Sequence, residues 1–359
     1  MPKLPIAFSE GVPLAPHTTL GLGGPARYFV ECHSVDALQA ALKYAGENHI
    51  RVQILGGGSN TIFSDAGFEG LVAHIALQGL SFALDGDHTL VSAAAGEVWD
   101  ELVRACVDRG LAGVECLAGI PGLVGATPVQ NVGAYGQEVC NTFVSLRALD
   151  RRTLELRDFD RKECQFGYRQ SRFKGIDRNR YVITEVTYRL QQNGPPKILY
   201  PELQKYIDAN VPLSSLPHGR PALNAVRSAV IALRKKKSMV LDSSDPNTTS
   251  VGSFFMNPIL TIAEFDALRE RWTASGRTEP IPTFAADNGM KIPAAWLVEK
   301  SGWPRGYRRG GVGISANHSL ALINCGGTAS ELIALAMEIR KKVGEVFGIT
   351  LELEPEVVR

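Results

Sequence analysis

The sequence lacks an excess of charge of either sign. Its 38 Lys and Arg residues nearly balance its 37 Asp and Glu residues, which leaves a net charge of +1. This balance provides no broad electrostatic field of the kind that attracts nucleic acids or membrane surfaces. We therefore expect neither nucleic acid nor a membrane as a partner, and any basic binding site must be local.

Cysteine is scarce, and its spacing carries no metal or redox signature. The six cysteines include no C-x-x-C pair and no zinc-like spacing with the seven histidines. We expect no metal site, and thiols of this kind are typical of a reduced cytoplasmic setting.

Long apolar runs are also missing. No stretch reaches the roughly 18 consecutive apolar residues that a membrane-spanning helix needs, and the N-terminal “MPKLPIAFSEGVPLAPHTTL” contains no signal-peptide core. We therefore expect a cytosolic protein.

The chain is long enough for more than one hydrophobic core. It has 359 residues, of which 45% are hydrophobic and 21% charged, as in soluble globular proteins. An α/β pattern gives way to strand-rich sequence near residue 77, and a polar loop at 238–250 follows a basic helix. We predict an α+β protein divided into residues 1–76, 77–231, 232–354 and 355–359.

Local patterns predict the main helices and strands. Ser34 precedes apolar residues at helical spacing and is expected to cap a helix, and basic residues end the helix at 221–237, as suits a C-terminus. The predicted helices span 34–50, 97–110, 221–237, 262–275 and 329–347, and the predicted strands span 51–55, 88–96, 181–190, 318–324 and 349–358.

Two segments are dense in glycine: “LGGGSN” (55–60) and “LAGIPGLVGATPVQNVGAYG” (117–136). Glycine lets backbone N–H groups converge on an anion, so the pair favours an anion-binding role over ordinary turns, although turns remain the alternative. Neither segment is a dinucleotide-binding G-x-G-x-x-G or a P-loop, so neither of those folds is predicted.

Eight segments together resemble the UDP-N-acetylenolpyruvoylglucosamine reductase family, flavoenzymes that complete UDP-N-acetylmuramate synthesis for peptidoglycan. The similarity runs from about residue 15 to 358 and is closest to the larger subtype, which has a substrate-covering tyrosine loop. The segments, in family order, are “TLGLGGPARYFV”, “LGGGSN”, “AGEVWDELV”, “GLAGVECLAGIPGLVGATPVQNVGAYGQE”, “ECQFGYRQSRFK”, “GSFFMNP”, “AAWLVEKSG” and “LELEPEVV”.

The resemblance implies a fold and two cofactors. It implies a two-part FAD-binding module of the vanillyl-alcohol-oxidase-like type, a C-terminal α/β substrate-binding domain, and NADPH as reductant. The absence of His and Cys from “LGGGSN” favours non-covalent FAD. The implied FAD-binding residues are Leu55, Gly56, Gly57, Gly58, Ser59, Asn60, Gly96, Glu97, Ile120, Pro121, Gly122, Gly125, Ala126, Gly133, Ala134 and Tyr135.

The implied reaction delivers a hydride to the methylene of an enolpyruvyl ether, so negative charge develops beside the substrate carboxylate and must be stabilised. The resemblance places Arg169 of “FGYRQS” there, next to Tyr168. A guanidinium fork holds a carboxylate at two points, which lysine does less well. Without the resemblance, Arg169 would read as a surface arginine.

The resemblance selects Glu356 in “LELEPEVV” as the acid, rather than Glu354. Both would share one face of a strand, and Pro355 between them indicates that the strand ends there and turns the next residue towards a site. The alternative is a solvated carboxylate at a strand end.

Ser253 in “GSFFMNP” is implied to be the proton donor, with Phe254 and Phe255 excluding water. It has no G-x-S-x-G context and no nearby histidine, so a hydrolase nucleophile is unsupported. On pattern alone, a helix N-cap is the stronger interpretation.

Four further residues are implied to bind the nucleotide sugar: Tyr200 on the covering loop, Lys237 on the diphosphate, Asn257, and His318, where some members have glutamine. For Lys237, a favourable charge at a helix C-terminus is nearly as good an interpretation.

Two other functions stay open from the sequence. One is another flavoprotein of this fold, such as a sugar or alcohol oxidase, and the other is a nucleotide-sugar binding protein without chemistry. A purified protein without bound yellow flavin would exclude both redox functions, and the presence of Arg169, Ser253 and Glu356 together argues against the binding protein.

Overall fold

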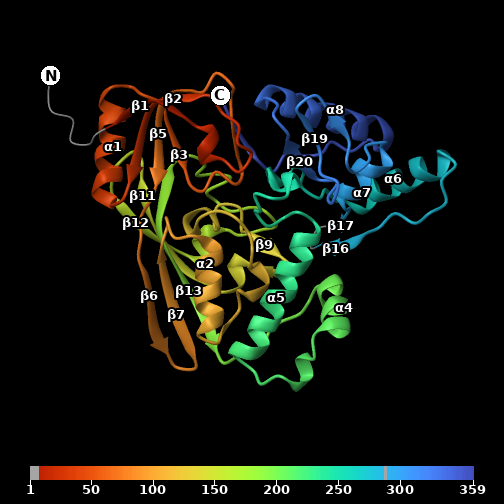
Figure 1. Ribbon diagram of the computed structural model, residues 1–359, viewed down its shortest axis with the longest axis horizontal. Helices are drawn as coiled ribbons and strands as arrows, with labels where there is room; N and C mark the ends of the chain where they lie inside the picture. Colours follow the sequence, from red (N-terminus) through yellow and green to blue (C-terminus); the bar gives the residue numbers. More distant parts are fainter. Residues whose placement is uncertain (1–7, 287–288) are drawn as a thin grey trace. The chain divides into compact units, whose positions relative to one another are not determined.

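The computed structural model describes residues 8–286 and 289–359, which form two compact units (Figure 1). The first unit contains the described residues up to Val12, Ala26–Gly57 and Glu69–Val240, and the second contains Pro13–Pro25, Gly58–Phe68 and Leu241–Arg359. The start of the predicted first domain, residues 1–7, lies outside the described residues.

These units do not follow the predicted boundaries, and Pro13–Pro25 of the predicted first domain belong to the second unit. Residues 58–68 group with the C-terminal part because the strand β4 (Thr61–Phe63) pairs in parallel with β21 (Glu356–Val358). The boundary at 231/232 falls inside the helix α5 (Arg220–Lys236), whose continuous hydrogen bonding keeps it in one unit. The division of the first unit at 76/77 stays a prediction.

The first sheet of the first unit has the strand order β1 (Ser9–Pro13), β2 (Pro25–Cys32), β5 (Phe68–Ile75) and β3 (Val52–Leu55). The helix α1 (Val35–Glu47) begins as predicted, because the Ser34 side chain accepts a hydrogen bond from the Ala37 N–H at 3.1 Å. Its apolar face, including Leu38 and Leu42, is buried in a core with residues of β2 and β5.

The second sheet of the first unit is antiparallel. Along its long strand β13, side chains alternate, so Val186, Tyr188 and Leu190 are buried while Glu185 and Arg189 face outward. Its strand order is β12 (Leu156–Asp160), β11 (Phe143–Asp150), β13 (Tyr181–Gln192), β7 (His88–Ala94) and β6 (Leu80–Asp85), with β8 (Leu111–Ala112) also on β13.

Helices cover the buried side of this second sheet. The helix α2 (Trp99–Asp108) lies against it with α5, and α4 (Pro201–Asn210) packs on α5 (Figure 1). The buried rings of Trp99 and Tyr188 meet edge to face with centroids 5.8 Å apart. Short elements in this unit are β9 (Gly133–Ala134), β10 (Gln137–Glu138), α3 (Arg161–Cys164), and 3-10 turns at Glu115–Leu117, Val124–Ala126, Val139–Asn141 and Leu213–Ser215.

The second unit is built on a four-stranded antiparallel sheet. Its core gathers Trp272, Trp296 and Phe347 from three helices. The sheet order is β14 (Ser250–Ser253), β20 (Ala321–Asn324), β19 (Val312–Ile314) and β18 (Arg308–Arg309). The other elements are β15 (Ile259–Leu260), β17 (Gly289–Lys291) and β16 (Phe284–Ala286) in one sheet, the helices α6 (Ile262–Ala274), α7 (Ala294–Lys300) and α8 (Ala329–Phe347), and 3-10 turns at Ala15–His17 and Pro246–Thr248.

The predicted α+β class and all five predicted helices are confirmed, whereas the predicted terminal strand at 349–358 is confirmed as a strand only at Glu356–Val358. Only an isolated bridge at Leu353 and the three-residue β21 form there. Pro355 lies between them and has no N–H to donate to a continuous ladder.

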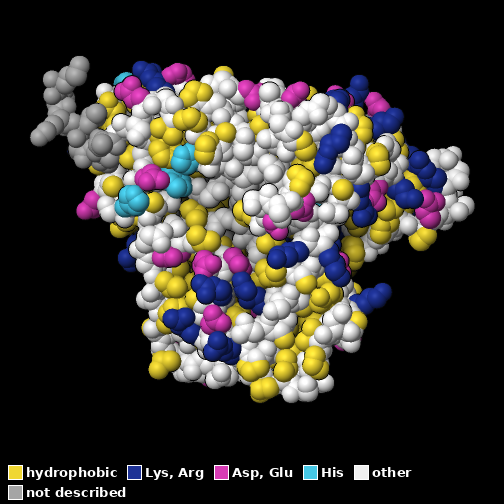
Figure 2. Space-filling view, viewed as in Figure 1, with side chains coloured by type: hydrophobic (Ala, Val, Ile, Leu, Met, Phe, Trp, Pro, Cys, Tyr) yellow, Lys and Arg dark blue, Asp and Glu magenta, His cyan; other side chains and the backbone are white. Residues whose placement is uncertain are grey.

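Figure 2 shows basic and acidic side chains interspersed over the visible face of each unit. Across residues 8–286 and 289–359, no helix is both long and apolar enough to cross a membrane. The same residues contain no group of three or more His, Cys, Asp or Glu side chains placed to hold a metal ion.

Candidate active site

Two glycine loops predicted to bind FAD lie against each other in the first unit. The first follows β3, where Leu55 is buried, and the second contains Gly122. A Cβ atom added to Gly57 would lie 2.9 Å from the Cα of Gly122, and one added to Gly56 would lie 3.9 Å from the Ala126 Cβ. The two backbones therefore approach as closely as only glycine permits.

A third predicted segment, which contains Gly96 and Glu97, is tied to the same loop. The Val124 N–H donates to the Glu97 carbonyl and the Gly125 N–H to the Ala95 carbonyl, both at 2.9 Å. A Cβ on Gly125 would lie 2.5 Å from the Ala95 Cβ. These glycines are required by the packing itself, so their FAD contacts stay a prediction.

The “LGGGSN” segment is shared between the units, with Gly58, Ser59 and Asn60 in the second. Gly58 has φ +61°, and a Cβ there would lie 1.9 Å from the His17 carbonyl oxygen, which excludes any other residue without rearrangement. Asn60 is bonded to the C-terminal segment, because its side chain donates to the Glu354 carbonyl at 3.2 Å.

Arg169 lies in a strained loop and reaches a predicted FAD-binding residue. Its guanidinium donates to the Gly133 carbonyl at 2.7 Å and lies 5.6 Å from the ring centroid of Tyr168. The backbone of Arg169 has φ +54°, in the left-handed region that residues other than glycine seldom occupy. Such strain persists only where the surroundings enforce it, and it is frequent at functional sites.

Asn131 connects the second glycine loop, to which it belongs, with the loop that carries Arg169. The sequence did not point to this residue. Its buried side chain donates to the Glu138 carboxylate at 2.8 Å and to the Gly167 carbonyl at 3.1 Å, and accepts from the Cys140 N–H at 3.0 Å. Asn131 also has φ +45°, which asparagine tolerates better than most residues. The sequence signal that could have identified Asn131 was an asparagine within a glycine-rich segment.

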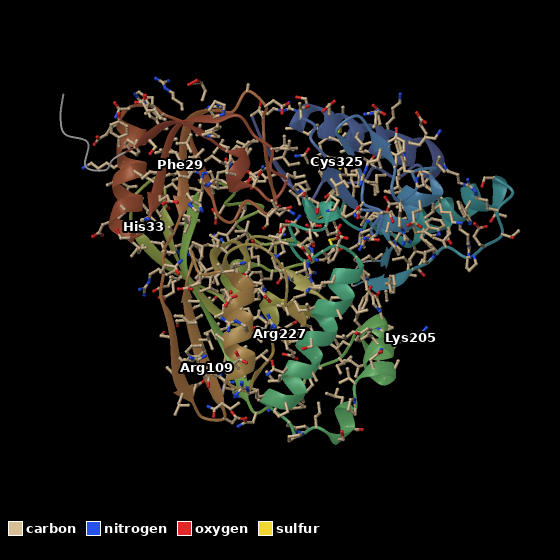
Figure 3. All side chains as sticks on the ribbon, in the orientation of Figure 1. Phe29, His33, Arg109, Lys205, Arg227 and Cys325 are labelled. Atoms are coloured by element: carbon tan, nitrogen blue, oxygen red, sulfur yellow. The ribbon has the colours of Figure 1, made fainter. Side chains whose placement is uncertain are left out.

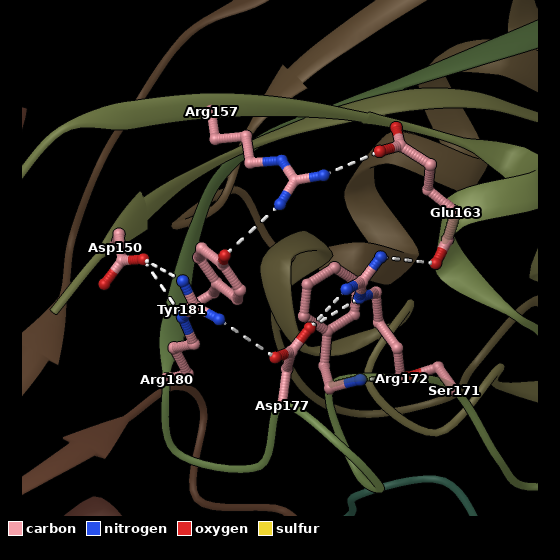
Figure 4. Close-up of polar contacts among 9 residues, drawn as sticks. Asp150, Arg157, Glu163, Ser171, Arg172, Asp177, Arg180 and Tyr181 are labelled. Atoms are coloured by element: carbon pink, nitrogen blue, oxygen red, sulfur yellow. Dashed lines mark hydrogen bonds and ion pairs between the residues drawn. The ribbon is translucent and has the colours of Figure 1, made fainter. Parts of the chain in front are cut away.

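A network of ion pairs supports the chain that follows Arg169 (Figure 4). The Arg172 Nε donates to the buried Asp177 carboxylate at 2.6 Å, and Arg172 also donates to the Glu163 carbonyl at 3.0 Å. Arg180 bridges Asp177 at 3.6 Å and Asp150 at 3.0 Å. These charges hold the chain after Arg169, while two backbone hydrogen bonds between Gly167 and Gln170, at 3.0 and 3.1 Å, close the turn that contains Arg169.

The predicted substrate residues Tyr200 and Lys237 both lie beside Tyr135. The rings of Tyr135 and Tyr200 meet edge to face with centroids 5.6 Å apart, and the Lys237 Nζ lies 5.9 Å from the Tyr135 centroid. Burial raises the pKa of Tyr135 to about 12 and also raises the pKa of Tyr200, so both hydroxyls stay protonated at neutral pH. Lys237 is also the C-cap residue of α5, so the helix-terminus interpretation fits equally.

Two arginines of α5 that the sequence analysis missed lie near the second glycine loop. Arg227, which is labelled on α5 in Figure 3, donates to Asp100 at 2.9 Å, and the other oxygen of Asp100 accepts from the Gly119 N–H at 2.6 Å. The Arg234 Nε would lie 3.5 Å from a Cβ on Gly119. Within the described residues, the Nε atoms of both arginines are buried without a hydrogen-bond partner. Burial lowers the pKa of Arg234.

In the second unit, Ser253 is the last residue of β14 and pairs with Ala321 of β20. It does not cap a helix, because the next helix begins at Ile262 and is capped by Thr261. In the part of the chain that the structure describes, the Ser253 hydroxyl makes no hydrogen bond. Phe254 and Phe255, which follow it, are both buried.

Glu356 is the first residue of β21, and its N–H donates to the Asn60 carbonyl at 2.9 Å. The prediction that Glu354 and Glu356 share a strand face is wrong, because Glu354 precedes the strand.

The segments that carry Ser253 and Glu356 are adjacent. The Glu354 N–H donates to the Phe254 carbonyl at 3.0 Å, and the Met256 N–H donates to the Glu352 carbonyl at 2.9 Å. This ladder, with a bridge between Phe255 and Leu353, aligns residues 254–256 with residues 352–354.

The other two predicted substrate residues, Asn257 and His318, have structural contacts. The Asn257 side-chain carbonyl accepts from the Ala294 N–H at the start of α7 at 2.8 Å. The His318 Nδ1 accepts from the Leu320 N–H at 3.0 Å, which leaves Nε2 to carry the proton of the neutral ring. Their substrate contacts stay predictions.

Comparisons with family models, curated relatives and solved structures all point to the same family. The family model described as “UDP-N-acetylenolpyruvoylglucosamine reductase, C-terminal domain” matches residues 245–358, and one described as “FAD binding domain” matches residues 26–155. These matches confirm the predicted order of an FAD-binding module followed by a C-terminal domain of the reductase type.

Curated relatives span the whole chain. The UDP-N-acetylenolpyruvoylglucosamine reductase of Thermobifida fusca is 44% identical over 98% of this chain and 98% of its own length. The same-named protein of Mycobacterium tuberculosis is 41% identical over 98% of this chain and 95% of its own length. The crystal structure of UDP-N-acetylenolpyruvylglucosamine reductase from Thermus caldophilus shares the fold, with a TM-score of 0.66 at 23% identity over 99% of this chain and 100% of that chain.

Proposed function

The chain belongs to the UDP-N-acetylenolpyruvoylglucosamine reductase family, and on this premise we propose that it reduces UDP-N-acetylglucosamine enolpyruvate to UDP-N-acetylmuramate for peptidoglycan synthesis. FAD and NADPH are its cofactors. Its partner is a small nucleotide sugar, and the proposed location is the cytoplasm, where NADPH is available.

The first unit fits a cofactor that carries a diphosphate. Gly57 and Gly122 approach so closely that a Cβ would fill the space between them, and backbone N–H groups in such loops suit anionic oxygens. The residues proposed to hold FAD are those of the three loops around Gly57, Gly96 and Gly122. FAD, when bound, supplies a carrier that takes a hydride from NADPH and gives it to the substrate methylene.

One observation carries the proposed mechanism: Ser253 and Glu356 lie on segments that hydrogen-bond to each other, although they are about a hundred residues apart in the chain. A hydride at the methylene leaves negative charge on the adjacent carbon and the substrate carboxylate. Ser253 is proposed to donate the proton that this carbon needs, with Glu356 as the neighbouring acid. The hydroxyl is available, because no described protein group engages it.

Arg169 is proposed to hold the substrate carboxylate. Its guanidinium offers a planar fork of donors, and the Gly133 carbonyl occupies one of them. Tyr168 packs beside it. Tyr200 is proposed to cover the substrate, while Lys237, Asn257 and His318 are proposed to bind the nucleotide sugar.

The test is the complete reaction with the purified, yellow protein. Oxidation of NADPH, followed at about 340 nm, should require the enolpyruvyl nucleotide sugar, and the product should have gained one hydride and one proton. Acid precipitation should release the flavin. Oxygen consumption with a sugar or alcohol, without any need for NADPH, would establish an oxidase instead, and a colourless protein would exclude both redox functions.

A further inference from the structure

Lys237, proposed to bind the substrate diphosphate, is already paired with a carboxylate of its own chain. The Lys237 Nζ lies 2.6 Å from the Glu202 Oε2, and the side chains are 33% and 39% exposed. The carboxylate oxygen is therefore placed where an anionic phosphate oxygen would bind the same ammonium.

The surroundings make Glu202 the local counterion. Arg234, Lys235 and Lys236 precede Lys237 in the last turn of α5. The ammonium of Lys236 lies 5.0 Å from the ring centroid of Tyr206. A diphosphate that replaces Glu202 enters this basic environment and carries more charge than the carboxylate that leaves.

Glu202 and Tyr200 lie together at the start of α4. Tyr200 is the N-cap of α4, Pro201 is its first residue, and the Gln204 N–H donates to the Tyr200 carbonyl at 3.0 Å. The proline ring fixes its own φ, so Tyr200 and Glu202 belong to one stiff helix start. The carboxylate that pairs with Lys237 therefore lies two residues after Tyr200, at the start of α4.

The segment around Tyr200 is anchored on both sides. On one side, the Lys197 N–H donates to the buried Glu115 carboxylate at 3.3 Å, and on the other side Leu203 is fully buried. Leu199, between these anchors, is 69% exposed. Because Leu203 holds the start of α4 in the core, the Glu202 carboxylate can leave Lys237 by side-chain rotation without a change in the core.

We propose that Glu202 is an internal substitute for the diphosphate: its carboxylate occupies Lys237 until the substrate diphosphate replaces it. Glu202 is thus a positioning residue that competes with the ligand. The inference rests on the proposed function of Lys237 and assigns a role to a residue outside the implied site.

The direction in which diphosphate affinity changes when Glu202 is removed distinguishes a competitor from a merely structural residue. Because exposed ion pairs are weak, loss of the competitor should tighten diphosphate binding by only about two- to fivefold. If Glu202 instead held Lys237 in its binding position, its removal would weaken binding. Added salt should reduce the gain, since the competition is electrostatic.

The experiment is calorimetric titration of the FAD-loaded protein with UDP, which needs no turnover. We expect Glu202→Gln and Glu202→Ala to bind UDP more tightly than the parent and Lys237→Met to bind it more weakly. In the Lys237→Met background, Glu202→Gln should give a smaller gain, because only the charge repulsion between the Glu202 carboxylate and the diphosphate is then relieved. Glu279→Gln is the matched control, because Glu279 pairs with Lys300 at 2.8 Å with side chains 44% and 40% exposed.

Unchanged or weaker UDP binding by both Glu202 variants, with retained flavin and unfolding temperature, would overturn the inference while leaving the proposed function in place. Tightening that is as large without Lys237 as with it, or that Glu279→Gln reproduces, would also overturn it. A parent protein that does not bind UDP at all would overturn the proposed function and the inference with it.

Discussion

The loop of Arg169 in the first unit and the strand end of Ser253 in the second are held in different ways. Arg169 has a strained backbone in a turn that backbone hydrogen bonds between Gly167 and Gln170 close. Side chains add to this support, namely the amide of Asn131 and the ion pair of Arg172 with Asp177. Ser253 is placed by backbone pairing with Ala321, and its own side chain takes no part. The position of Arg169 therefore depends in part on the side chains of other residues. The position of Ser253 is set by its backbone, so its side chain can be replaced without moving the strand.

The largest expected effect comes from replacing Ser253, whose side chain is not needed to hold the strand. Ser253→Ala should bind FAD and be reduced by NADPH at nearly the parent rate, yet be reoxidised by the enolpyruvyl sugar roughly 10²–10⁴-fold more slowly, because only that step needs a proton. Stopped-flow absorbance of the flavin measures each half-reaction separately. Ser253→Cys, which keeps a donor, should lose less.

Reoxidation of Ser253→Ala within about threefold of the parent, well below a general-acid effect, would contradict the assignment. The proton donor would then lie elsewhere, with Glu356 the next candidate.

The second prediction removes support from the Arg169 loop. Asp177→Asn leaves Arg172 and Arg180 without their buried carboxylate, and loss of one partner of a buried pair typically costs about 3–5 kcal/mol of unfolding free energy. Urea unfolding measures the loss. The control is Asp158→Asn, whose pair with Arg147 has side chains 66% and 50% exposed and should cost less than about 1 kcal/mol. Equal losses would show that the network does not fix the loop.

The third prediction concerns the guanidinium of Arg169 itself. Arg169→Lys keeps the charge but loses the fork, so KM for the enolpyruvyl sugar should rise about ten- to hundredfold, as expected for hydrogen bonds to a charged group. Reduction of the flavin by NADPH should change little. Arg147→Lys is the control, because the Arg147 side chain on β11 is exposed. Equal damage to both half-reactions would show that Arg169 supports the flavin site rather than the substrate.

The smallest effect is a pH dependence of the same network. Burial alone would raise the pKa of Asp150, but hydrogen bonds from the Arg152 N–H and the Arg180 guanidinium outweigh it and lower the pKa. Because the folded pKa lies below the unfolded value of about 3.9, this stabilisation is present above that pH and is lost as pH falls through the folded pKa.

Thermal unfolding of the parent and Asp150→Asn at about pH 5 and pH 3 tests that sign. The difference in stability between the two proteins should shrink at the lower pH. A difference that stays constant would mean that Asp150 acts through its shape alone.

Local structure was predictable because its causes lie within a few residues. The Ser34 cap needs only the N–H of Ala37, and each predicted helix follows an apolar pattern that its own sequence carries. The predicted terminal strand is interrupted for a reason that is also local, because Pro355 has no N–H. The sequence did not show which residues after Pro355 would pair.

The sequence by itself determined the helices, the order of the glycine loops and the motifs that identify the family. Only the tertiary structure decided that residues 254–256 pair with residues 352–354, that Arg169 adopts a positive φ, and that Glu202 pairs with Lys237. The physical reason is range: helix caps and turns are set by hydrogen bonds to near neighbours. A ladder between distant segments or a strained backbone exists only when the surrounding core and its charges hold it in place.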